Sequence, residues 1–160
     1  MTTTVEPYTL AREEGQPIWF LGTLMILKAT GENTNGAYGL IEQTLPPGFA
    51  PPLHVHHRED EAFYLLEGAA TFTCGNQTMK AVPGSYVFFP RDIPHWFHVE
   101  GNQPARLLQF NFPAGLEHFF VEMGEPAQKL TLPPAGPPDI GKLAETAARY
   151  GMEILGPPPV

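Results

Sequence analysis

The most informative segment of the sequence is Gly48-Phe-Ala-Pro-Pro-Leu-His54-Val-His56-His57-Arg-Glu59-Asp60-Glu61-Ala-Phe-Tyr-Leu-Leu-Glu-Gly68. His54 and His56 are two positions apart, so in an extended chain their side chains leave on the same face. Glu59 and Glu61 are also two positions apart, so in an extended chain both side chains could point toward the protein interior. Two imidazoles beside a carboxylate suit a divalent first-row metal. The stretch therefore predicts extended chain around a metal site.

A second segment, Gly84-Ser-Tyr-Val-Phe-Phe-Pro90-Arg-Asp-Ile-Pro94-His95, places another imidazole after a proline-bounded turn. A strand that begins there could bring His95 opposite the first pair. Three histidines and one carboxylate leave coordination positions open, as a reactive metal site requires. A histidine on an apolar strand is more often a hydrogen-bonded core residue, but the carboxylate and the second segment favour the metal. The other histidines are expected to face away from it: His57, His98 and His118.

The sequence around these segments is a series of short β-type runs separated by Gly, Pro and Asn. Residues 19–30 are densely apolar, and residues 18–27 are expected to form one long N-terminal strand. Asn35-Gly36 is a strong hairpin dipeptide. Further strands are predicted at residues 37–45, 61–66, 69–74, 77–82, 85–89, 95–99 and 105–112. Many short strands at this spacing indicate an all-β antiparallel sandwich or barrel.

The C-terminal third has a helical pattern instead. Apolar residues recur at i, i+3, i+4 and i+7 before Gly124, a candidate helix stop: Leu116, Phe119, Phe120 and Met123. After a proline-rich linker at 132–138, Asp139 is a candidate N-cap for a second helix that ends at Gly151. Both helices are expected to pack outside the β unit. The resulting division is 1–36 for N-terminal strands that complete the barrel, 37–112 for the barrel core, and 113–160 for the helices and a proline-rich tail.

Composition excludes several classes of partner. The 160 residues suit one domain, and the net charge of −8 disfavours binding to nucleic acid or to an anionic membrane. One cysteine, Cys74, cannot form an internal disulfide, and the first residues do not resemble a secretory leader. A cytoplasmic location is therefore expected.

The two segments resemble the motifs of the cupin superfamily. The first motif of that family is matched at every element by Gly48, His54, His56, Glu61 and Gly68. The second is matched at Gly84, Pro90 and His95, but Asp92 stands where the family has Gly and Val99 where it has Asn. The loss of that glycine suggests a different turn. The resemblance implies a single-domain cupin, a jelly-roll barrel or double-stranded β-helix, and it implies that His54, His56, Glu61 and His95 bind one divalent transition metal: Fe, Mn, Co, Ni, Cu or Zn.

A narrower resemblance concerns activity. The sequences of residues 51–64 and of the C-terminal residues 150–158 are similar to those of single-domain bacterial cupins described as quercetinase-like. That resemblance implies a metal-dependent dioxygenase that acts on a flavonol-like or other hydroxylated aromatic or enolisable small molecule. Glu61 or Glu59 could accept the proton of a metal-bound hydroxyl. Two alternatives stay open: a non-catalytic metal-containing binder of small ligands, and a sugar or keto-acid isomerase.

The expected ligand pocket follows from strand parity and from the abundance of aromatic residues. Its predicted lining is Phe63, Leu65, Tyr38, Phe88, Phe97 and Phe110. Arg58 and Arg91 are the only cationic residues near the motifs, so a phosphorylated ligand, which needs a cationic clamp, is disfavoured. The exposed edge of the long N-terminal strand predicts a homodimer, which is also how cupins commonly assemble according to the resemblance.

Overall fold

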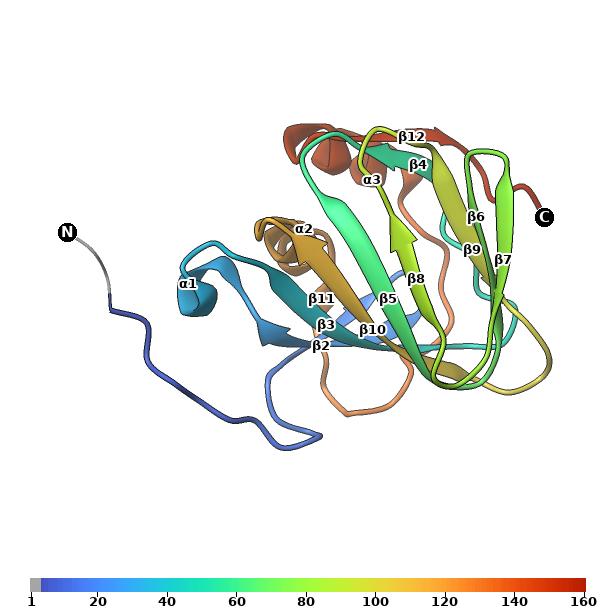
Figure 1. The fold of residues 1–160 in the computed structure, drawn as a ribbon. Coiled ribbons are helices and arrows are strands. Elements are labelled where there is room, and N and C mark those ends of the chain that lie inside the picture. The colour runs from blue at the N-terminus through green and yellow to red at the C-terminus, as the bar shows by residue number, and fades with distance from the viewer. Residues whose placement is uncertain (1–3) are drawn as a thin grey trace.

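The computed structural model describes residues 4–160, which form two antiparallel sheets facing each other (Figure 1). The larger sheet has the order β11-β1-β2-β3-β10-β5-β8, and the smaller has the order β12-β4-β9-β6-β7. The strands are β1 (Gln16–Phe20), β2 (Thr23–Ala29), β3 (Gly39–Leu45), β4 (Leu53–His56), β5 (Asp60–Glu67), β6 (Ala70–Cys74), β7 (Gln77–Ala81), β8 (Tyr86–Phe89), β9 (His95–Val99), β10 (Ala105–Phe112), β11 (Glu125–Pro126) and β12 (Met152–Gly156). The predicted all-β jelly-roll fold is confirmed.

The core between the sheets comes from alternate residues of each strand. In β6 and β9 every second residue is buried, the pattern of strands with one face on a core. Phe63 of the larger sheet meets Phe72 and Phe97 of the smaller one, with ring centroids 5.1 and 5.9 Å apart. These aromatic contacts fill one end of the sandwich.

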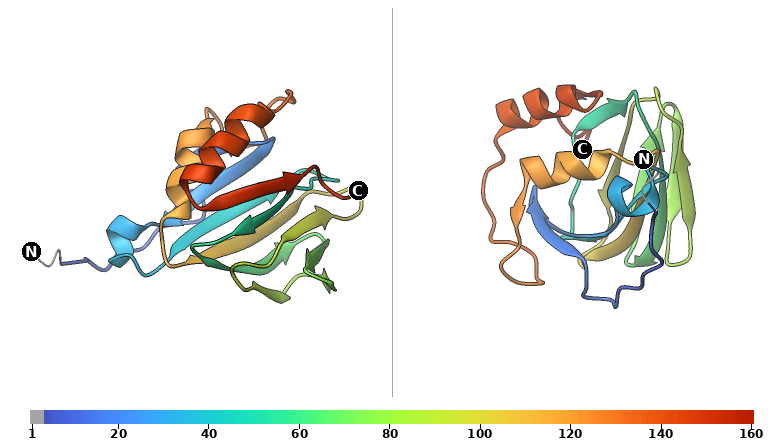
Figure 2. Two further views of the ribbon diagram at one scale, coloured as in Figure 1. Left: turned by 90° about the horizontal axis from the view of Figure 1, so that it is seen from above. Right: turned by 90° about the vertical axis from the view of Figure 1, so that its left-hand side faces the viewer.

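The helices are α1 (Gly31–Thr34), α2 (Leu116–Met123) and α3 (Ile140–Arg149). Helices α2 and α3 lie side by side, with α2 against β1 and β3 and α3 against β12, so together they bridge the two sheets (Figure 2). They stand outside the strands, as expected, but their apolar faces complete a second core. That core joins Phe20 and Met25 to Phe119, Phe120 and Leu143.

The N-terminal apolar run is a hairpin, so the prediction of one long strand over residues 18–27 is wrong. Leu21 and Gly22 both have positive φ, 46° and 80°, and turn the chain between β1 and β2. Both strands carry apolar side chains, which is why the run looks continuous in the sequence. The outer edge of β1 pairs with β11 at Ile18 and Trp19 and is therefore partly covered.

Two predicted turns differ in detail. Asn35 and Gly36 have the positive φ expected of them, 56° and 79°, but they end α1 instead of forming a two-residue hairpin between β2 and β3. Gly124 follows α2 with a φ of −86°, so it is not a left-handed cap. A Cβ there would lie 2.6 Å from the carbonyl oxygen of Trp19, and this close approach explains the glycine.

The C-terminal segment contains more than helices and a tail. Asp139 caps α3 by accepting a hydrogen bond from the Lys142 amide at 3.0 Å, as predicted. Beyond α3, β12 joins the smaller sheet beside β4, a strand the sequence pattern did not reveal. Within residues 4–160, no helix is both long and apolar enough to cross a bilayer.

Candidate metal centre

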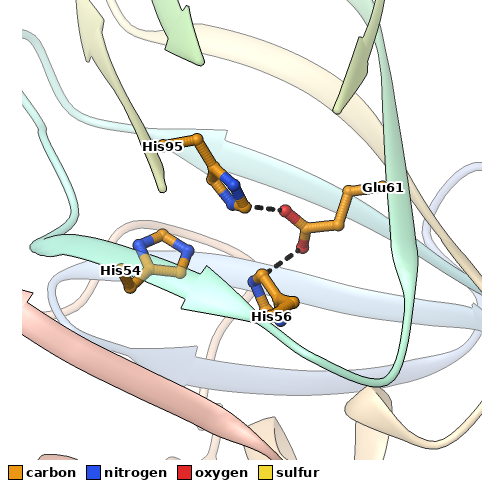
Figure 3. A group of neighbouring side chains, drawn as sticks. All are labelled: His54, His56, Glu61 and His95. Atoms are coloured by element: carbon orange, nitrogen blue, oxygen red, sulfur yellow. Dashed lines mark ion pairs between the residues drawn. The ribbon is translucent and has the colours of Figure 1, made fainter. Parts of the chain in front are cut away.

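Three strands bring four candidate ligands together. His54 and His56 lie on β4, His95 lies opposite His54 on the neighbouring β9, and Glu61 reaches across from β5 in the other sheet (Figure 3). One nitrogen or oxygen atom of each lies within 4.8 Å of those of the others. His56, Glu61 and His95 are buried, and His54 is partly buried. The fold thus brings together the four candidate metal ligands that the sequence motifs indicate.

The Nδ1 atom of each imidazole faces an acceptor outside the cluster. The acceptor is the Pro52 carbonyl for His54 at 2.6 Å, the Glu59 carboxylate for His56 at 2.7 Å and the Ile93 carbonyl for His95 at 3.1 Å. A neutral imidazole that donates from Nδ1 keeps a lone pair on Nε2. All three histidines are therefore set to use Nε2 toward the cluster, which is how partners behind a metal ligand orient it.

The centre of the cluster leaves buried polar atoms without hydrogen bonds. His56 Nε2 lies 3.3 Å and His95 Nε2 lies 2.9 Å from Glu61 oxygens (Figure 3), yet neither nitrogen makes a hydrogen bond among residues 4–160. Buried polar atoms without partners are rare and costly. A cation between these atoms would satisfy them, so the set fits a divalent metal and could bind one.

The charges of the cluster are strongly coupled. Burial, reinforced by His56 and His95, lowers the pKa of His54 to about 3, so this ring stays neutral. Burial also lowers the pKa of His56, but Glu61 and the hydrogen bond to Glu59 outweigh it, and the net shift is upward. Burial raises the pKa of Glu61, but His56 and His95 outweigh it and hold the pKa well below its usual range. The cluster therefore holds an anionic carboxylate among its imidazoles.

Three buried amides support Glu61, and none of them was predicted from the sequence. Asn111 Nδ2 and Gln109 Nε2 donate to Glu61 Oε1 at 3.0 and 2.9 Å, and Gln43 contacts Gln109 from β3. The exposed fraction of each amide side chain is 4% or less. Gln109 and Asn111 share the parity of buried Leu107 on β10, which is the signal that could have revealed them.

Glu59 does not join the cluster. The chain bends after His56, and β5 begins only at Asp60, so the parity argument does not carry across the bend. The Glu59 carboxylate is buried behind His56 and is absent from the cavity wall, whereas Glu61 lines the cavity. The predicted direct contact of Glu59 with a ligand is not supported, and its place is that of a residue that orients His56.

A cavity opens beside the cluster, between the sheets and the two C-terminal helices. Of the residues predicted for a ligand pocket, Phe63 and Phe97 line this cavity, while Leu65 lies deeper in the core. Other apolar residues of its wall were not foreseen, because they come from β1, β2, the loop before β4 and the helices: Phe20, Met25, Phe49, Phe119, Phe120 and Leu143.

The prediction that Tyr38, Phe88 and Phe110 line the pocket is wrong. Phe110 lies on the outer face of β10, near the ring of Tyr38 at a centroid distance of 6.5 Å. Phe88 is 45% exposed. Their parity is opposite to that of the inward residues of the same strands. Aromatic content alone could not reveal this, since both faces of the larger sheet carry apolar residues.

The other three histidines and Asp92 lie outside the cluster. His57 and His118 are exposed and His98 is partly exposed, so all three lie away from the cluster as expected. His57 pairs with Asp92 at 2.6 Å. Asp92, where the family motif has Gly, has a φ of 67°, the left-handed region that favours glycine. Asp92 therefore adopts a backbone conformation that glycine adopts readily.

The comparisons with known proteins agree with this architecture. A family profile described as "Cupin domain" matches residues 41–111. The quercetin 2,3-dioxygenase of Bacillus subtilis (strain 168) is 25% identical over 151 residues, which is 93% of this chain and 44% of that protein. The chain spans about half the length of the curated relatives it matches.

Among solved structures, a predicted oxalate decarboxylase from Thermotoga maritima has a TM-score of 0.61 at 22% identity, over 66% of this chain and 99% of that one. A putative sugar phosphate isomerase from Acidithiobacillus ferrooxidans has a TM-score of 0.50 at 28% identity, over 63% and 69% of the two chains. The two facing sheets, the cluster and the family match together show that residues 41–111 of the chain form a cupin domain.

Proposed function

We propose that this cupin is a metal-dependent dioxygenase that acts on a neutral, hydroxylated aromatic or enolisable small molecule. The observation that carries the proposal is the wall of the cavity beside the cluster. Among the residues of 4–160 that line it, none is Lys or Arg, and most are apolar. A ligand there would find a metal site, two amides and hydrocarbon.

This wall distinguishes between the activities named for similar proteins. A sugar phosphate requires cationic or backbone donors for its phosphate, and Arg and Lys are the usual side chains for that task. The cavity supplies neither side chain. A planar phenol or enol, bound through its oxygens to a metal and through its ring to apolar residues, matches the wall. The name of the Bacillus subtilis relative, quercetin 2,3-dioxygenase, supports the same class.

The chain's own residues would bind and orient such a substrate. His54, His56, His95 and Glu61 would hold the metal, which would supply the Lewis acidity that lowers the pKa of a substrate hydroxyl. Glu61 Oε1 already accepts hydrogen bonds from Gln109 and Asn111, so Oε2 is the oxygen that would face the metal. A carboxylate with so low a pKa would not keep the substrate's proton, so the substrate would bind as its anion with that proton released to bulk water. Phe119, Phe120 and Leu143 would keep water from the site. The reaction with O2 is taken from the family resemblance.

The test is to load the purified protein with Fe, Mn, Co or Ni, add quercetin and follow its visible absorbance beside an oxygen electrode. We expect both signals to fall with the wild type and neither to fall with His95→Ala. A shift in absorbance without oxygen uptake in every metal form would favour the non-catalytic binder. Turnover of a sugar or keto acid without oxygen uptake would favour the isomerase.

We further propose a homodimer and a cytoplasmic location. The edge of β1 no longer argues for a dimer, because β11 covers part of it. Instead the outer face of the larger sheet exposes aromatic residues that a second copy would cover: Tyr64, Tyr86, Phe88 and Phe112. A mass of 17.6 kDa by light scattering at high protein concentration would refute the dimer. The free, buried Cys74 suits a reducing compartment, which cell fractionation would test.

A further inference from the structure

The row of buried amides beside the cluster has a fixed hydrogen-bond direction. It begins at Glu61 Oε1, which accepts from Gln109 Nε2 at 2.9 Å and from Asn111 Nδ2 at 3.0 Å. A carboxylate oxygen offers only lone pairs, so both amides must turn their NH2 groups toward it. The chemistry of Glu61 thus fixes the orientation of two amides whose nitrogen and oxygen would otherwise be interchangeable.

The orientation of the Gln109 side-chain amide is also fixed by its hydrogen bonds. Its NH2 group has two hydrogens, and these go to Glu61 Oε1 and, at 3.2 Å, to Asn111 Oδ1. Only Oε1 of Gln109 remains, and it can only accept. The group that faces it is Gln43 Nε2, on the adjacent strand β3. Gln43 must therefore direct its nitrogen to Gln109.

The last atom in this row of amides is the side-chain carbonyl oxygen of Gln43, which has no hydrogen-bond donor in the described part of the chain. Within residues 4–160, Gln43 Oε1 accepts no hydrogen bond, although the side chain is only 3% exposed and lines the cavity. This oxygen is accessible from the cavity, where it can accept a hydrogen bond from a bound molecule. The amide cannot turn over to hide this oxygen, because it would then set two oxygens against each other at Gln109.

We propose that Gln43 is a specificity-determining residue whose carbonyl oxygen accepts a hydrogen bond from a hydroxyl group of the ligand. The proposal rests on the proposed function, since it takes the ligand to be a hydroxylated aromatic bound in this cavity. The ligand then needs two features: oxygens that bind the metal, and a separate hydroxyl that reaches Gln43. Phenols that carry only the metal-binding pair lack the second feature and should bind more weakly.

Two probes separate these features. Quercetin carries hydroxyls beyond the 3-hydroxyl and 4-carbonyl pair, whereas 3-hydroxyflavone carries only that pair and has no donor left once it binds a metal. Both are titrated anaerobically into the Co(II)-loaded protein, so that binding is measured without turnover. The variants are Gln43→Met, which keeps the length but removes the hydrogen bonds, and Gln43→Asn, which withdraws the carbonyl by one methylene. Gln77→Met, on the exposed strand β7, is the matched control.

We expect the wild type to bind quercetin more tightly than 3-hydroxyflavone. Both Gln43 variants should raise the Kd for quercetin about five- to tenfold, leave the Kd for 3-hydroxyflavone within about twofold and keep the cobalt content. Gln77→Met should change neither Kd. The inference is overturned if the Gln43 variants weaken both probes equally or neither, or if the wild type binds the two probes alike. If the wild type binds neither, the proposed function fails and the inference fails with it.

Discussion

Replacing Glu59 by Gln tests how the buried carboxylate behind His56 supports the metal site. Glu59 accepts from His56 Nδ1 at 2.7 Å with about 4% of the residue exposed, and glutamine keeps the shape and an acceptor while it removes the charge. A hydrogen bond to a charged group contributes about 1.5–3 kcal/mol and a neutral one about 0.5–1.5 kcal/mol. The difference of about 1–1.5 kcal/mol corresponds to a loss of metal affinity of roughly five- to tenfold.

Losses of about 10–100-fold are typical for residues that orient a metal ligand, so we expect the Kd for Co(II) to rise by about tenfold in Glu59→Gln. Glu61→Gln should lose more than about 100-fold, because it removes the charged member of the cluster itself. The assay is competition with a chromophoric chelator at pH 7, with metal content by mass spectrometry. Glu145→Gln, an exposed change on α3, is the matched control and should have no effect. A loss in Glu59→Gln as large as that in Glu61→Gln would refute our assignment of their roles.

Four further outcomes are expected. Metal affinity should rise with pH through the raised pKa of His56, because the metal displaces its proton, and calorimetry in buffers of different ionisation enthalpy should detect proton release. The metal-free protein should be most stable near pH 6.5, as measured by urea titrations across pH. Stability from the raised His56 pKa is lost as pH rises above 6.5. The lowered pKa of His54, about 3, costs stability as pH falls below 6.5, and stability from the lowered Glu61 pKa is lost as pH falls below 4.5. Phe119→Ala should cost about 3–5 kcal/mol in urea unfolding, because this buried ring packs on Phe20 and lines the cavity, and a cost under 1 kcal/mol would mean that α2 does not close the site. Asp139→Ala should cost about 0.5–2 kcal/mol through loss of the α3 cap, whereas an unchanged urea midpoint would show that the cap is dispensable.

The four candidate ligands and most of the strands could be predicted from local sequence alone, although β12 and the turn at Leu21 and Gly22 could not. His54 and His56 are two apart on one strand, and a side chain's direction in a strand depends only on local parity. The proline-bounded turn before His95 and the capped helix at Asp139 are local signals of the same kind. Each of these features depends on neighbours within a few residues, so each could be predicted before any long-range contact was known.

The inward face of each strand, and the groups that meet across the sheets, became clear only in the folded protein. Phe110 and Gln109 are adjacent on β10, and the sequence favours the aromatic residue for the interior, yet the amide is inside because it pairs with Glu61 from β5. Glu59 and Glu61 share a parity, but the bend between β4 and β5 separates their roles. Strand pairing brings distant residues together, and the cost of burying a polar group depends on the partner it meets there. That partner is fixed by register between strands and not by the pattern along one of them.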